Sequence, residues 1–149
     1  MRLVIQRVKE ARVIIKEEIV GEIGRGLLVF LGVGREDTEA DVDYLLDKII
    51  HLRIFPDGQE KFNLSLKDVV GALLVVSQFT LWGDCRKGRR PSFSESAPAA
   101  TAQPLYELFV EKARQRGIPI ACGRFQEMME VHSINDGPVT LLLDSKKKF

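Results

Sequence analysis

Two runs of almost continuously apolar residues most constrain how this chain can fold. Leu27–Val33 contains a single glycine among apolar side chains, and Ala72–Val76 contains no polar residue. Short apolar runs without polar alternation are typical of strands that are covered on both faces. The sequence therefore predicts a sheet with two buried strands, and other elements must cover both of its faces.

Shorter strands and two amphipathic helices accompany these runs. The further strands are predicted at Leu3–Val8, Arg12–Ile15, Ile19–Ile23, Phe125–Ile134 and Val139–Leu143, with a turn at Asn135–Pro138. One helix is predicted from its N-cap Thr38 to His51, and a second over Ala102–Arg116. This order predicts a single α/β domain over residues 1–149, with a mixed, largely antiparallel sheet or open barrel and the two main helices packed outside.

Composition narrows the classes of function. Apolar residues make up 45% of the 149 residues, which suits one globular domain. The 22 basic and 21 acidic side chains leave a net charge of +1. A contact with nucleic acid must therefore come from a local patch. No apolar run approaches the roughly 20 residues of a membrane helix, and the two cysteines give no disulfide framework, so we expect a cytoplasmic protein.

The common catalytic constellations are absent from the sequence. The only histidines are His51, at a predicted helix end, and His132, in a predicted strand, and no serine has the GxSxG spacing of a nucleophile elbow. Cys85 and Cys122 have no paired metal-ligand spacing with either histidine. The sequence therefore predicts no metal and no cofactor.

A long irregular stretch, Gly83–Ala100, is the first candidate functional segment. It contains four cations in five residues, Arg86, Lys87, Arg89 and Arg90. Such a run either binds phosphates or forms a solvated surface, and the sequence alone leaves both interpretations open. The rings of Phe79, Trp82 and Phe93 lie nearby in the sequence as candidate stacking faces for bases.

The second candidate is a group of polar residues that follows the buried strand Ala72–Val76. If the strand continued, Ser77 would face one side while Gln78 and Thr80 faced the other. Their side chains either satisfy backbone groups at the strand end or, together with free backbone N–H groups, form an oxyanion site. Spacing alone favours the structural role.

The sequence resembles the D-aminoacyl-tRNA deacylase family at two signature motifs, Ser77-Gln78-Phe79-Thr80-Leu81 and Asn135-Asp136-Gly137-Pro138-Val139-Thr140. The resemblance covers the whole chain, with shorter matching segments at Met1–Val8, Leu52–Phe55, Asn63–Ser65, Arg90–Phe93, Gly123–Phe125 and Met129. One departure is Gln126-Glu127, where the family commonly has small residues.

The resemblance implies hydrolysis of the ester in D-aminoacyl-tRNA, without metal or cofactor, and rejection of L-aminoacyl-tRNA. Mischarged glycyl-tRNA is a further candidate substrate. The implied catalytic residues are Ser77, Gln78, Phe79 and Thr80, and the implied substrate-binding residues are Phe125, Met129, Gly137 and Pro138. In the family, a Gly–cis-Pro pair reaches the partner subunit's active site, so the resemblance also implies a homodimer.

Two mechanistic alternatives accompany the first motif. Either the Thr80 hydroxyl is the nucleophile, or the Phe79 backbone N–H stabilises the oxyanion while the RNA ribose 2′-hydroxyl helps to activate water. Because no base stands beside Thr80 in a readable motif, the sequence favours the second. The competing functions are a non-catalytic RNA-binding module and a small-molecule ester hydrolase. The resemblance does not establish the four-cation run as the tRNA contact.

Overall fold

One long strand is at the centre of the sheet. A computed structural model describes residues 1–149, and in it β1 (Arg2–Ile15) pairs antiparallel with β3 (Gly26–Gly32) and β2 (Glu18–Ile23). It also pairs antiparallel with β8 (Glu130–Asp144). β6 (Ala72–Ser77) pairs parallel with both β3 and β7 (Ile120–Cys122), which gives the order β2-β1-β3-β6-β7 with β8 on β1.

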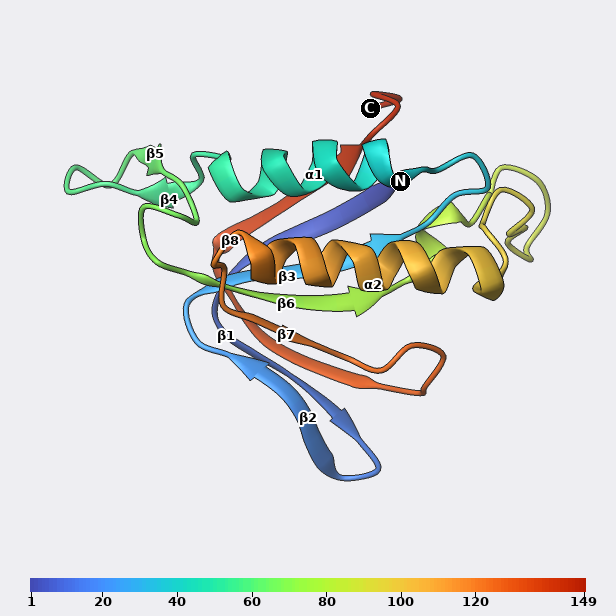
Figure 1. Ribbon diagram of the computed structural model, residues 1–149, viewed down its shortest axis with the longest axis horizontal. Helices are drawn as coiled ribbons and strands as arrows, with labels where there is room; N and C mark the ends of the chain where they lie inside the picture. The colour runs from blue at the N-terminus through green and yellow to red at the C-terminus, as the bar shows by residue number, and fades with distance from the viewer.

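The ends of this sheet approach one another. A Cβ added to Gly21 of β2 would lie 2.7 Å from the carbonyl oxygen of Cys122 in β7, although the two strands are not neighbours in the sheet. Figure 1 shows the lower part of the sheet curling so that β2 and β7 face each other. The predicted mixed sheet is therefore confirmed, and it is nearly closed into a barrel.

Both predicted helices are present on one side of the sheet. α1 (Glu39–His51) and α2 (Ala99–Gln115) lie next to each other over the same face (Figure 1). Leu27, Leu73 and Val75 belong to the large core beneath the helices, whereas Leu28 and Leu74 belong to a smaller core on the opposite face. The two apolar runs are thus buried on both faces, as their composition predicted.

The start of α1 lies where the sequence predicts it, whereas the start of α2 does not. Thr38 precedes α1 as predicted, and its backbone N–H and its hydroxyl donate to the Asp41 carboxylate at 2.8 and 3.2 Å. α2 begins at Ala99 instead of Ala102, directly after Pro98. The prediction was three residues late because Ala99–Thr101 continue the small-residue composition of the loop before them.

The strand predictions need three corrections. β1 is continuous through Lys9 and Glu10, which had separated two predicted strands; they are exposed residues within one strand. Residues 125–129 lie outside β8, and a backbone hydrogen bond from Glu127 to the Arg124 carbonyl closes a turn there. Three short strands were not predicted from the sequence, namely β7, β4 (Phe55–Pro56) and β5 (Phe62–Leu64).

The predicted turn at Asn135–Pro138 does not reverse the chain, because β8 continues in one direction through these residues. Gln6 of β1 is opposite Thr140, and Val8 is opposite Asn135, so Asp136–Val139 bulge from the strand opposite Arg7. The turn-like composition therefore produces a loop within a strand instead of a reversal of the chain.

The lysine run at the C-terminus packs against α1. Lys146 Nζ lies 2.8 Å from Oδ1 of Asp41, whose side chain is only 6% exposed. Burial alone would raise the pKa of Asp41, but hydrogen bonds from Lys146, Ser145 and the Thr38 backbone hold it below its ordinary value. Asp41 therefore links the start of α1 to the C-terminal segment.

No helix in the protein is long and apolar enough to span a bilayer.

Asp41→Asn is expected to lower the free energy of unfolding by about 1–3 kcal/mol at neutral pH, because charged hydrogen bonds disappear at a buried position. A folded-state pKa below the unfolded value contributes stability above a pH of about 4, and that contribution disappears as the pH falls further. Urea unfolding of the unaltered protein and of Asp41→Asn should therefore show a difference in the free energy of unfolding that becomes smaller in acid. Glu22→Gln is the control, because the Glu22 side chain is exposed and forms no ion pair. A difference that is independent of pH would contradict this account.

Candidate active site

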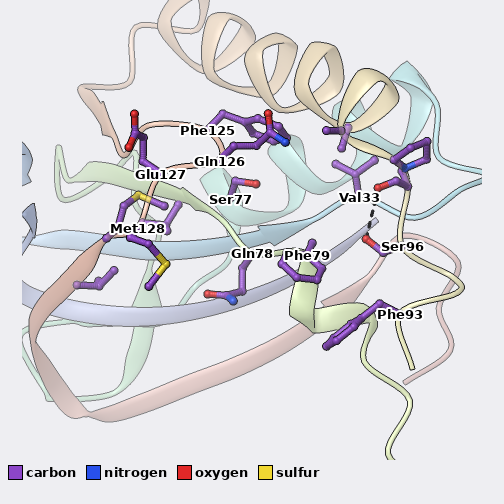
Figure 2. Close-up of a pocket in the computed structure, with 17 residues that line it drawn as sticks. Val33, Ser77, Gln78, Phe79, Phe93, Ser96, Phe125, Gln126, Glu127 and Met128 are labelled. Atoms are coloured by element: carbon purple, nitrogen blue, oxygen red, sulfur yellow. Dashed lines mark hydrogen bonds between the residues drawn. The ribbon is translucent and has the colours of Figure 1, made fainter. Parts of the chain in front are cut away.

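A cavity of about 720 Å³ opens where β6 ends, beside the N-terminus of α2 (Figure 2). Its walls are mostly apolar and come from three parts of the chain: the end of β6, the segment that enters α2, and the segment before β8. The lining residues are Val33, Val76–Phe79, Phe93, Ser96–Ala99, Ala102, Phe125–Met129 and Val131. The cavity thus joins segments that are distant in sequence.

The first wall contains three of the four predicted catalytic residues. β6 ends at Ser77, and the Gln78 N–H donates to the Leu31 carbonyl at 2.8 Å. The chain then enters a 3-10 turn, η1 (Phe79–Trp82). The strand-like alternation expected beyond Ser77 is therefore wrong, because the chain leaves the sheet there.

The start of the turn leaves two backbone N–H groups without an acceptor in the turn. Its first internal hydrogen bond runs from the Leu81 N–H to the Gln78 carbonyl at 3.3 Å. The N–H groups of Phe79 and Thr80 precede that bond, so they have no acceptor within the turn. Phe79 is 56% exposed and makes an edge contact with Phe93, with the ring centres 5.0 Å apart. A donor and an aromatic surface thus share one rim of the cavity.

Thr80 is the predicted catalytic residue that does not line the cavity. It is exposed, and its hydroxyl accepts a hydrogen bond from the Gln78 side-chain amide. Neither histidine lines the cavity; His51 ends α1, and His132 lies in β8. Glu127 is the one ionisable side chain in the lining. The neighbour of the Thr80 hydroxyl is therefore an amide and not a base.

The opposite wall contains Phe125 and Met129, both predicted to bind substrate. The Phe125 ring packs against Tyr106, with centres 5.8 Å apart, and the buried Tyr106 hydroxyl donates to the Val75 carbonyl at 2.9 Å. Burial raises the pKa of Tyr106, which keeps this donor protonated. A Cβ on Gly123 would overlap Met129 Sδ, so a larger residue at this position would require the Met129 side chain to shift.

Gln126, part of the departure from the family pattern, has a backbone φ of +63°. This left-handed conformation costs little for glycine and more for a residue with a Cβ. The backbone at this position therefore favours glycine over a residue with a Cβ, such as the glutamine present here.

The middle wall of the cavity belongs to the irregular stretch Gly83–Ala100, whose length predicted a functional segment. Residues 94–97 run beside the chain that follows β3, where the Ala97 N–H donates to the Val33 carbonyl at 3.0 Å and the Arg35 N–H donates to the Glu95 carbonyl at 3.1 Å. Pro98, Ala99 and Ala102 then line the cavity from the start of α2. A second signal was the run of small residues from Ser96 to Ala102, which leaves space beside a helix start.

Gly137 and Pro138 are exposed and do not line this cavity. Their peptide bond is cis. Buried Arg7 holds the bulge, since its Nε donates to the Asp136 carbonyl at 3.1 Å and its Nη1 donates to the Ile54 carbonyl at 2.6 Å. Within one chain, the structure does not bring the second motif to the cavity.

The four-cation run lies in a closed loop next to the cavity. Reciprocal backbone hydrogen bonds of 2.7 and 2.9 Å join Asp84 and Ser92 at its base, and Phe93 follows in the cavity wall. Arg86 forms an ion pair with Asp84, with Nη2 and Oδ2 2.7 Å apart, and this bond raises the pKa of Arg86. The other cations, Lys87, Arg89 and Arg90, are exposed and form no ion pair.

Two sequence expectations concern stacking and metal binding. Trp82 is only 8% exposed, so it is not available as a stacking face for bases, whereas Phe79 and Phe93 are accessible at the cavity. No group of three or more His, Cys, Asp or Glu side chains is arranged to hold a metal ion.

Comparison with known proteins identifies the family. A family model described as D-Tyr-tRNA(Tyr) deacylase matches residues 4–144. Relatives named D-aminoacyl-tRNA deacylase from Alkaliphilus metalliredigens and Syntrophobacter fumaroxidans are 60% and 58% identical, over 100% of both chains.

Two solved structures have the same fold. A c-Myc DNA Unwinding Element Binding Protein is 39% identical, with a TM-score of 0.92 over 97% of this chain and 98% of that chain. A probable eukaryotic D-amino acid tRNA deacylase is 19% identical, with a TM-score of 0.83 over 95% of this chain and 97% of that chain. Because the family model matches nearly the whole length, this chain belongs to the D-Tyr-tRNA(Tyr) deacylase family.

Proposed function

We propose that this protein hydrolyses the ester bond of D-aminoacyl-tRNA, releases the D-amino acid and tRNA, and spares L-aminoacyl-tRNA. The observation that carries the proposal is the cavity wall at Ser77–Phe79, where the first family motif presents a backbone donor beside an apolar pocket. Discrimination against the L enantiomer makes this a chiral proofreading activity in translation. A tRNA substrate and two free cysteines favour the cytoplasm.

The proposed mechanism uses the backbone of η1. The ester carbonyl oxygen accepts a hydrogen bond from the Phe79 N–H, which stabilises the negative charge that develops when water adds to the carbonyl carbon. The bond to the ribose 3′-oxygen then breaks, and that oxygen takes a proton. The neighbouring ribose 2′-hydroxyl activates the water, since the cavity offers no histidine. An aminoacyl ester is already reactive, so positioning and one well-placed donor supply the needed catalysis.

The chirality filter is proposed to act between two copies of the chain. Gly137 and Pro138 form an exposed bulge outside their own cavity, so they can contact a substrate only in the cavity of another copy. The same strand exposes the apolar side chains of Ile134 and Leu142, which are 50% and 59% exposed. Exposed apolar side chains on one strand are suited to a protein contact. Backbone carbonyls of the inserted bulge would hold the substrate α-ammonium and leave no space for an L side chain.

The three unpaired cations Lys87, Arg89 and Arg90 are proposed to contact the phosphates of the tRNA. They stand on the loop whose base adjoins Phe93, a residue of the cavity wall. A tRNA whose 3′ end enters the cavity would bring its backbone close to this loop.

The direct test follows ester loss from D-Tyr-tRNA and L-Tyr-tRNA. Hydrolysis should be confined to the D form and should persist in EDTA. A binding module would release no amino acid, and a small-molecule hydrolase would cleave a free D-tyrosyl ester equally well. Equal loss of both enantiomers, or activity that is abolished by EDTA and restored by zinc, would contradict the proposal.

Thr80→Ala should keep activity within about tenfold of the unaltered protein, because the backbone N–H groups of η1 remain. A covalent nucleophile would instead lose several orders of magnitude. Single-turnover deacylation measures this, and Thr101→Ala is the matched control, because Thr101 is exposed and does not line the cavity. An acyl-enzyme trapped on Thr80 would overturn the backbone mechanism.

Gly137→Ala should impair D activity or L rejection by about tenfold or more while the protein stays folded. At a φ of +132°, an added Cβ would lie 2.8 Å from Val139 Cγ2 and 3.1 Å from Arg7 Nη2, so the bulge must move. Gly24→Ala is the control, because its Cβ would have no neighbour within 4 Å. Unchanged kinetics on both enantiomers in Gly137→Ala would refute the filter.

Replacing Lys87, Arg89 and Arg90 with alanine should weaken tRNA binding at low salt. The slope of log affinity against log salt should become shallower by about 2–3, because each phosphate that is no longer neutralised keeps its counterion. Arg86→Ala should have a smaller effect, because Asp84 already pairs with that guanidinium. Fluorescence titration of labelled tRNA measures both, and an unchanged slope would make this loop a solvated surface.

A further inference from the structure

The first residue of β1 contacts the turn that carries the Phe79 N–H. Arg2 Nη1 donates to the Leu81 carbonyl at 3.0 Å, and the Arg2 guanidinium carbon lies 4.0 Å from the centre of the Trp82 ring. Both partners belong to η1. One side chain therefore contacts this turn through a hydrogen bond and a cation–π contact.

Arg2 is itself fixed within the sheet. Its Nε donates to Oδ2 of Asp144 at 3.1 Å, and the Asp144 side chain is fully buried at the end of β8. Strand pairing places the Arg2 backbone opposite Gly32 of β3 and Asp144 of β8. A guanidinium with this many contacts has little freedom to move.

The Trp82 ring depends on these surroundings for its position. Its Nε1 is buried and has no hydrogen-bond partner. The chain after β3 packs closely against the ring, since a Cβ on Gly34 would lie 2.5 Å from Trp82 Cζ2. Packing against this segment and the contact with Arg2 therefore hold the indole, and with it the end of η1.

We propose that Arg2 is a positioning residue for deacylation, which fixes η1 so that the Phe79 N–H points at the ester carbonyl oxygen. This inference rests on the proposed function. Arg2, Leu81 and Trp82 do not line the cavity, so Arg2 acts through the turn and not on the substrate. A small displacement of an oxyanion donor reduces the rate of the chemical step far more than it reduces substrate binding.

The test compares Arg2→Lys with Arg12→Lys. Lysine keeps the charge but cannot bond Leu81 and Asp144 while stacking on Trp82. Arg12 lies on the same strand, is exposed and forms no ion pair or side-chain hydrogen bond, which makes it a matched control. Trp82 is the only tryptophan in the chain, so its fluorescence reports directly on the turn.

Arg2→Lys should change the Trp82 emission and lower kcat by about 10- to 100-fold, with KM within about twofold. Arg12→Lys should change neither. The positioning role would be overturned if Arg2→Lys had the same kcat as the control. It would also be overturned if the unfolded fraction of the variant accounted for its whole loss of kcat. If the unaltered protein had no deacylase activity, the proposed function itself would be contradicted. This result is distinct from a failure of the positioning role of Arg2, in which the unaltered protein is active.

A second pair of variants covers the case in which Arg2→Lys does not fold. Trp82→Phe keeps an aromatic ring against the guanidinium and should retain most of kcat, whereas Trp82→Leu should lose about tenfold. Equal kcat values in the two variants would contradict the proposal.

Discussion

The parallel pairing of β3 with β6 is the interaction on which the rest of the structure depends. The pair begins with close backbone contact, since a Cβ on Gly26 would overlap the Ala72 carbonyl oxygen. It ends with Leu31 opposite Ser77. Because parallel strands end at the same edge of a sheet, this register places the chain after β3 beside the start of η1. The cavity forms at this edge, and the start of α2 completes it.

The chemistry proposed for this edge depends on the backbone more than on reactive side chains. The cavity is mostly apolar, and its one ionisable lining residue is the exposed Glu127. An amide donor such as the Phe79 N–H is more effective beside an apolar wall than in water. A site of this kind needs an accurately placed turn, which explains why much of the surrounding sequence serves packing. Gly34 against Trp82 and Gly123 against Met129 are examples.

Local patterns predicted the parts of the fold that local forces determine. The buried strands followed from Leu27–Val33 and Ala72–Val76, and the N-cap at Thr38 followed from short-range hydrogen bonding. The predicted turn at Asn135–Pro138 does not separate two strands, because Arg7, more than 120 residues away in sequence, holds the bulge within β8. Sequence spacing cannot reveal a contact of that kind.

The candidate site was predictable only in part, for the same reason. The resemblance to the family identified Ser77–Phe79, Phe125 and Met129, and the structure brings these residues to one cavity. The wall at Ser96–Ala99 depends on pairing with the chain after β3, which no local motif indicates. The ion pair of Arg86 with Asp84 spans only two residues, so it could have been anticipated from the sequence.

In the proposed mechanism, the Phe79 N–H binds the carbonyl oxygen of a D-aminoacyl ester. The most direct measurement is an NMR titration of the amide-labelled protein with a non-hydrolysable amide analogue of the D-tyrosyl-adenosine end of tRNA. We expect the Phe79 amide resonance to shift strongly with the D analogue and to remain unchanged with the L analogue. An unshifted Phe79 resonance in a protein that binds the D analogue elsewhere would contradict it.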